Sequence, residues 1–243
     1  MLHDPIKPAS TGAVRLTLAS PSELSSDLIL KIASALDHAE DAGPSAYVEI
    51  EIRGADHFVN PALWPGKTDV MTINKWEQLL RRIERMQTLS AVSIKGHCTA
   101  EALELLMVAD YRCMVSESAI HLSAKGHDVW PGMMLYRLSN QIGYGKARRP
   151  ILFGGMLTGE QLHQWGVVDT MTTTDAPFDV REWCIATTNP GDLPMRRRLL
   201  LDAVDLSYDE AFGAHLAACD RTLKRSEERA ATPTHQADEA SFA

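Results

Sequence analysis

Two stretches near the beginning of the chain alternate apolar and polar residues, which is the pattern of a β-strand with one buried face. They cover residues 13–19 and 46–52. Between them, apolar residues recur every three or four positions in residues 24–36, which predicts an amphipathic helix whose first turn contains Pro21. The chain therefore begins with a strand, a helix and a second strand.

The middle of the chain repeats this order of helix and strand. An apolar stripe in residues 76–86 predicts a further helix, and a short apolar strand at 91–94 leads into a helix rich in Ala and Leu that carries Glu101 and Glu104. Two extended segments follow within residues 111–123. Because the first N–H groups of a helix are unpaired and partially positive, the helix after residues 91–94 is a suitable place for chemistry.

Helical patterns dominate the remainder of the chain. They cover residues 133–142, 146–153, 158–166, 179–188, 195–204 and 208–224. A short strand begins at Val167. We therefore predict three parts, an α/β core at 1–178, a helical segment at 179–225 and a disordered tail at 226–243, which has too few apolar residues to fold.

Composition narrows the class of protein. With 243 residues, 45% of them hydrophobic and 23% charged, the chain can bury one sizeable core. Its net charge of -8 argues against a nucleic-acid partner, since phosphate binding needs clustered Lys and Arg. We find no apolar run long enough to span a membrane and no signal peptide, so we expect a cytoplasmic protein. The four cysteines lack metal-ligand spacing, and we expect no metal site.

A series of short motifs in a fixed order carries a family resemblance. The motifs are AVSIKGH at 91–97, EL at 104–105, ADYR at 109–112, WPG at 130–132, LTGE at 157–160 and WGVVD at 165–169. Through them the chain resembles the enoyl-CoA hydratase/isomerase, or crotonase, superfamily. The resemblance implies a crotonase-like spiral of ββα units with C-terminal helices, assembled as a homotrimer or hexamer. It also implies an acyl thioester substrate, with CoA or phosphopantetheine as part of that substrate and no separate cofactor.

The resemblance also implies roles for particular residues. Members of this superfamily hold the thioester oxygen between two backbone N–H groups that stabilise an enolate, and the matching positions here are Glu101 and Asn60. Their hydratases place two carboxylates across the substrate; Glu104 matches the first, whereas Ala124 stands at the second and cannot transfer a proton. The implied reaction is dehydration or enol isomerisation with Glu104 as the single general acid/base. Pro61 restricts the backbone of Asn60.

Other side chains of this region have both a functional and a structural interpretation. Asp128 could supply the missing acid. His97 and His121 could contact a substrate oxygen or serve only the structure, and Trp130 could line an acyl pocket or simply pack. For Glu104 itself the alternative is an exposed position on its helix, the usual place of a glutamate.

A closer likeness is to the accessory crotonase homologues of 3,5-dihydroxyphenylglycine biosynthesis, which assist a type III polyketide synthase. Residues 76–84, 109–112 and 130–138 carry it. Two functions therefore stay open. The first is an enzyme of secondary metabolism, such as antibiotic biosynthesis, acting on an acyl-CoA or carrier-bound polyketide thioester. The second is a catalytically weak accessory subunit that assists a partner polyketide synthase or a homologous crotonase.

Overall fold

The computed structural model describes residues 6–8, 12–20, 22–43, 46–57, 64–123, 129–173 and 192–231. The chain divides into two compact units, Met1–Pro194 and Met195–Ala243. The predicted boundary at residue 178 and the helix predicted at 179–188 lie outside the described residues, and so does Pro21.

Two β-sheets form the framework of the first unit. The larger sheet has the strand order β1-β2-β3-β4-β6-β9, in which β1 pairs antiparallel and the other strands pair parallel. The smaller sheet has the order β5-β7-β8. The strands of the larger sheet are β1 (Ile6–Pro8), β2 (Ala13–Ala19), β3 (Tyr47–Arg53), β4 (Leu89–Lys95), β6 (Tyr111–Val115) and β9 (Thr170–Thr172). Those of the smaller sheet are β5 (His97–Thr99), β7 (Ala119–His121) and β8 (Met156–Thr158).

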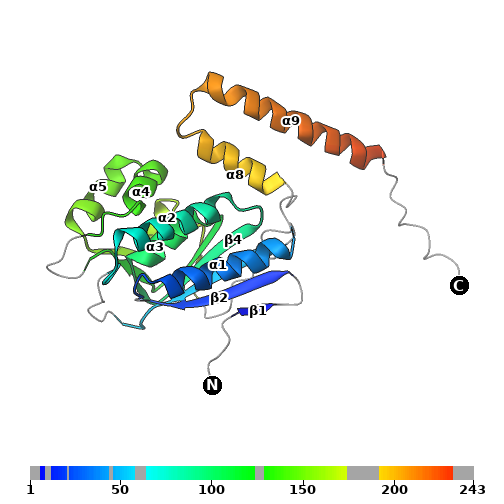
Figure 1. Ribbon diagram of the computed structural model, residues 1–243. Helices are drawn as coiled ribbons and strands as arrows, with labels where there is room; N and C mark the ends of the chain where they lie inside the picture. Colours follow the sequence, from blue (N-terminus) through cyan, green and yellow to red (C-terminus); the bar gives the residue numbers. More distant parts are fainter. Residues whose placement is uncertain are drawn as a thin grey trace, which may run out of the picture. The chain divides into compact units, whose positions relative to one another are not determined.

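Three helices lie along one face of the larger sheet, as Figure 1 shows: α1 (Ser26–Asp41), α2 (Val70–Arg85) and α3 (Ala100–Val108). Strand register places Leu16, Ile50 and Val92 in one row across β2, β3 and β4, and all three are buried in the main hydrophobic core. The strands predicted at 13–19, 46–52 and 91–94 and the apolar stripe of α2 are confirmed. Burying such a row against helices is what stabilises a parallel sheet.

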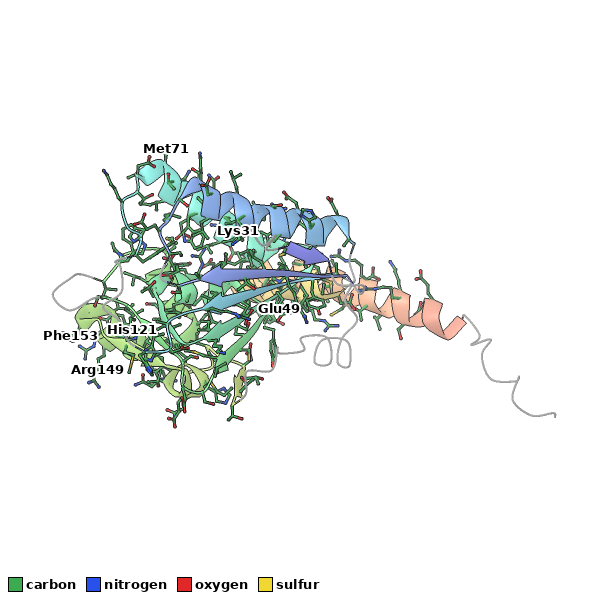
Figure 2. The ribbon with its side chains drawn as sticks, turned by 90° about the horizontal axis from the view of Figure 1, so that it is seen from below. Lys31, Glu49, Met71, His121, Arg149 and Phe153 are labelled. Carbon is green, nitrogen blue, oxygen red and sulfur yellow. The ribbon has the colours of Figure 1, made fainter. Side chains whose placement is uncertain are left out.

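The opposite face of the larger sheet is buried in part. There Ala13, Tyr47, Ala91, Tyr111 and Cys113 form a second, smaller cluster. Glu49 of β3 lies on this face, and its carboxylate accepts a hydrogen bond of 2.8 Å from Arg15 Nε in the adjacent position of β2. Figure 2, which views the molecule from below, labels Glu49 on these strands. The alternation predicted one buried face for β3, which is confirmed for Val48, Ile50 and Ile52, but Tyr47 and Glu49 on the other face are buried as well.

Some element boundaries differ from those predicted. Helix α1 begins a turn later than expected, because Ser25 caps its N-terminus by accepting from Leu28 N. The strand predicted from Val167 begins at Thr170 instead. The first unit also contains α4 (Met134–Ile142), α5 (Tyr144–Phe153) and α6 (Gly159–Gln164), all near their predicted positions.

The second unit, described by itself, contains most of α8 (Leu193–Asp202) and all of α9 (Tyr208–Ala231). Ser207 precedes α9, and its Oγ accepts from Glu210 N while Glu210 Oε2 accepts from Ser207 N. The helix extends into the segment predicted as a tail, because the Glu and Ala residues after 226 are strong helix formers. Residues 232–243 lie outside the described chain.

A close crossing of backbones directs the chain from β4 into β5 and on to α3. Gly96, between β4 and β5, has a positive φ of 81°. A Cβ there would lie 2.7 Å from the Ala55 carbonyl oxygen and 2.9 Å from that of Gly54. His97 N then donates to Ala55 O at 2.7 Å. Only glycine allows this approach without moving the backbone, so Gly96 fixes the direction in which the chain enters α3.

We expect Gly96→Ala to lower the free energy of unfolding by at least about 3 kcal/mol, because it adds both a positive φ for alanine and a clash with two carbonyl oxygens. Gly166→Ala is the matched control, since Gly166 has a φ of 73° with nothing within 4 Å of an added Cβ. That control should cost about 1 kcal/mol. Urea denaturation measures both, and equal losses would show that the crossing tolerates a side chain.

Candidate active site

Helix α3 lies entirely inside the protein. All nine of its residues are buried, including Glu101 and Glu104. Its Ala, Leu, Met and Glu residues favour helix intrinsically, while its N-cap residue Thr99 makes no side-chain capping bond. The alternative interpretation of Glu104, an exposed position on its helix, is therefore wrong. Both carboxyl groups need polar partners, because an unpaired charge is costly to bury.

Two indole groups bind the carboxyl group of Glu104, whose side chain is fully buried. Trp76 Nε1 on α2 donates to Glu104 Oε2 at 2.7 Å, and Trp64 Nε1 donates to the same oxygen at 3.2 Å. The two indole rings pack edge to face, with centroids 5.4 Å apart. The other oxygen, Oε1, has no hydrogen-bond partner among the described residues. One oxygen is thus held and the other is available.

The WPG segment lies against this available oxygen. A Cβ added to Gly132 would lie 2.6 Å from Glu104 Oε1 and 2.5 Å from Trp130 Nε1. Gly132 therefore lets the backbone approach the carboxyl group more closely than any other residue would. Trp130, a predicted substrate contact, is half-buried beside Glu104. Three of the five tryptophans of the chain thus lie around a single carboxyl group.

Burial raises the pKa of Glu104 to about 8. The hydrogen bond from Trp76 opposes this rise because it favours the charged form, and the charge of Arg137 also opposes it, whereas the charges of Glu77 and Glu101 increase it. Arg137 on α4 is itself paired with Glu77 at 3.0 Å and with Glu84 at 2.7 Å, both on α2. At neutral pH Glu104 is therefore mostly protonated but close to its titration midpoint, as suits a general acid/base.

Glu101 makes a different set of contacts. Its carboxyl group accepts from Ser20 Oγ at 2.5 Å, from Thr99 Oγ1 and from Ser22 N at 3.4 Å. Burial raises the pKa of Glu101, and the hydrogen bonds from Ser20, Thr99 and its own backbone N–H oppose that rise. The side chain thus connects the end of β2 to the start of α3. The role of its backbone N–H as an oxyanion donor stays a prediction.

The two histidines singled out in the sequence lie together. His97 on β5 and His121 on β7 have Nδ1 and Nε2 atoms 2.9 Å apart, and their rings stack with centroids separated by 5.3 Å. Burial, and then the charge of His97, lower the pKa of His121. One ring donates a hydrogen bond to the other, which accounts for this pair structurally. Their contact with a substrate stays a prediction.

The remaining predicted site residues, Asn60 and Asp128, lie outside the described residues, as do Pro61 and Ala124. Two residues of the site were not predicted from the sequence. The sequence places Trp76 in an apolar stripe and in the stretch that carries the closer likeness, without a role at the site, and it assigns nothing to Trp64. Chemistry rather than spacing could have identified them. A buried indole N–H needs an acceptor, and the apolar helix with Glu104 offers a carboxylate.

The family follows from sequence similarity. Residues 63–187 match the family model described as Enoyl-CoA hydratase/isomerase. An enoyl-CoA-hydratase of Amycolatopsis orientalis is 31% identical to this chain over 216 residues, which cover 88% of this chain and 97% of that protein. The chain therefore belongs to the enoyl-CoA hydratase/isomerase family.

Solved structures with the same fold confirm the predicted crotonase-like architecture. The enoyl-CoA hydratase of Thermoplasma volcanium has a TM-score of 0.71 at 20% identity and covers 90% of this chain and 91% of its own. The enoyl-CoA hydratase of Mycobacterium smegmatis has a TM-score of 0.75 at 15% identity, with 90% of each chain covered. At these identities the likeness shows the fold.

Two further findings concern the described part of the chain. It contains no helix whose length and apolar character would suffice for a membrane crossing. Nor do its His, Cys, Asp and Glu side chains form a group of three or more that could hold a metal ion.

We expect Glu104→Gln to change how stability depends on pH. A glutamate in the unfolded chain has a pKa of about 4.3, whereas Glu104 in the folded protein has a pKa of about 8. Between these values the folded chain keeps a proton that the unfolded chain has lost. The stability of the wild type therefore falls as pH rises, by up to about 1.4 kcal/mol per unit, and this slope ends near the folded pKa.

The Gln variant lacks this contribution. Its free energy of unfolding relative to that of the wild type should therefore rise from about pH 5 to about pH 8. Urea denaturation at a series of pH values measures the difference. Glu160→Gln, on an exposed position of α6, serves as the control and should leave the slope unchanged. Wild type and Glu104→Gln curves that run parallel would contradict the raised pKa.

Proposed function

We propose that this protein acts on an acyl thioester, linked to CoA or phosphopantetheine, by dehydration or enol isomerisation with Glu104 as the single general acid/base. The observation that carries the proposal is the state of the Glu104 carboxyl group. It is buried, one oxygen is held by two indoles, the other has no partner among the described residues, and its pKa is about 8. The name of the relative from Amycolatopsis orientalis, an enoyl-CoA-hydratase, supports the substrate class.

One carboxyl group suffices for either reaction. In an isomerisation, the Glu104 carboxylate removes a proton from a carbon atom and the resulting carboxylic acid returns it at another carbon of the conjugated system. In a dehydration, it removes the proton next to the thioester carbonyl and then donates it to the departing hydroxyl group, which leaves as water. With a pKa of about 8, both forms of Glu104 are populated at neutral pH.

The thioester oxygen needs stabilisation while the enolate exists. We assign this to backbone N–H groups at Glu101 and Asn60, since Glu101 stands in the first turn of α3, where N–H groups have no acceptor within the helix.

A second function is favoured by two observations. Ala124 stands where hydratases of this family carry their second acid, and Glu104 has no exposed surface. Both fit a catalytically weak accessory subunit that assists a polyketide synthase or a homologous crotonase. The likeness to the accessory homologues of 3,5-dihydroxyphenylglycine biosynthesis supports the same context, in which the final dehydration to an aromatic ring is strongly favourable. In either case we propose a homotrimer or hexamer.

The experiment is proton exchange in heavy water. Enoyl, β-hydroxy and polyketide thioesters are incubated with the protein, and mass spectrometry records deuterium uptake and loss of water. We expect the wild type to catalyse at least one of these reactions and Glu104→Gln to lower its rate by about a hundredfold or more. The amide still accepts from the indoles but cannot transfer a proton.

Glu160→Gln is the matched control and should keep the wild-type rate, because this glutamate occupies an exposed position of α6. If thioesters bind but the wild type exchanges no proton with any of them, the stand-alone enzyme is refuted and the accessory function gains support.

A further inference from the structure

We propose that Trp64 and Trp76 are positioning residues, which hold one oxygen of the Glu104 carboxyl group and so fix the other, Oε1, as the atom that exchanges a proton with the substrate. This inference rests on the proposed function of Glu104 and adds two residues and one defined atom to it.

The hydrogen bonds distinguish the two carboxyl oxygens. Oε2 accepts from both indoles, at 2.7 and 3.2 Å, whereas Oε1 accepts from none of the described residues. When Glu104 is neutral, the carbonyl oxygen can accept two hydrogen bonds and the hydroxyl oxygen carries the proton. Oε2 is therefore the carbonyl oxygen, and the proton belongs on Oε1. When the proton leaves, the same two donors stabilise the carboxylate without any rearrangement.

The indoles are themselves held firmly. Trp76 is 1% exposed and Trp64 is 6% exposed, and both belong to the main hydrophobic core. Their edge-to-face packing fixes one ring against the other. Trp76 belongs to α2, which the buried Arg137 connects to α4 through Glu77 and Glu84. A rigid donor of this kind restricts the carboxyl group to one orientation, which is what precise proton transfer requires.

Other charged groups around Glu104 also affect its pKa. They are Glu77 on α2, Glu101 on α3 and Arg137 on α4. None of them occupies Oε2, which the indoles hold. A change in the indole donors should thus be separable from a change in these charges.

The test begins with nuclear magnetic resonance of protein labelled with ¹⁵N in tryptophan, in which the chain gives five indole N–H signals. We expect the signals of Trp64 and Trp76, identified by their loss in Trp64→Phe and Trp76→Phe, to shift together with a midpoint of about pH 8. In Glu104→Gln both should become independent of pH in that range, because the acceptor no longer titrates. If no indole signal follows Glu104, the inference is wrong, whatever the activity.

The second part measures deuterium exchange against pH for Trp76→Phe and Trp64→Phe, each of which removes one donor and keeps an aromatic ring. The inflection that belongs to Glu104 should move to higher pH in both, because the lost bond favoured the charged form. The shift should be larger for Trp76→Phe, whose bond is the shorter of the two. Exchange limited by the base at pH 7 should fall roughly tenfold in Trp76→Phe.

Trp165→Phe is the matched control, because Trp165 packs against the core at the end of α6 and should leave the indole titration and the rate profile unchanged. An unaltered profile in Trp76→Phe would refute the positioning role. If the indoles titrate with Glu104 while the wild type transforms no thioester, the contact stands and the proposed function fails. Should either variant fail to fold, the titration of the wild type and of Glu104→Gln still decides the inference.

Discussion

The structure of this protein depends on how it accommodates a carboxyl group in an otherwise apolar interior. A charged Glu104 would be very costly to bury, and Arg137, whose charge acts on it, is already bonded to Glu77 and Glu84. The protein instead stabilises the neutral form by burial and supplies two N–H donors to one oxygen. As a result the pKa of Glu104 lies close to neutral pH. The contacts that allow the carboxyl group to be buried therefore also suit it to proton transfer.

Two sets of contacts in the surrounding fold hold the Glu104 carboxyl group in place. On one side, Gly96 lets two backbones cross so that the chain enters β5 and then α3 along a fixed path, and Glu101 joins the start of α3 to Ser20. On the other side, α2 brings Trp76 to the carboxyl group and Gly132 allows the WPG segment to approach it. The family's fold accounts for the position of Glu104, whereas these local contacts determine its electrostatic environment.

The sequence predicted those features that depend on local pattern. Alternation located β2 and β3, an apolar run located β4, an apolar stripe located α2, and motif order indicated the family and singled out Glu104. It did not predict β5 and β8, because strands of three residues owe their existence to pairing partners that are distant in sequence. It misjudged the second face of β3, where Arg15 pairs with Glu49 across the sheet. The indole donors were missed for the same reason, since Trp64 before α2 and Trp76 on α2 bind Glu104 on α3 across spacings in the chain that carry no signal.

The protonation state of Glu104 at neutral pH is the central claim, and infrared difference spectroscopy of wild type against Glu104→Gln measures it without any substrate. We predict a carbonyl band of a neutral, buried carboxyl group at pH 7 that is lost with a midpoint of about pH 8. A spectrum at pH 7 that contains only the bands of an ionised carboxylate would contradict this account, because it would mean that the two indoles and their surroundings hold a charge.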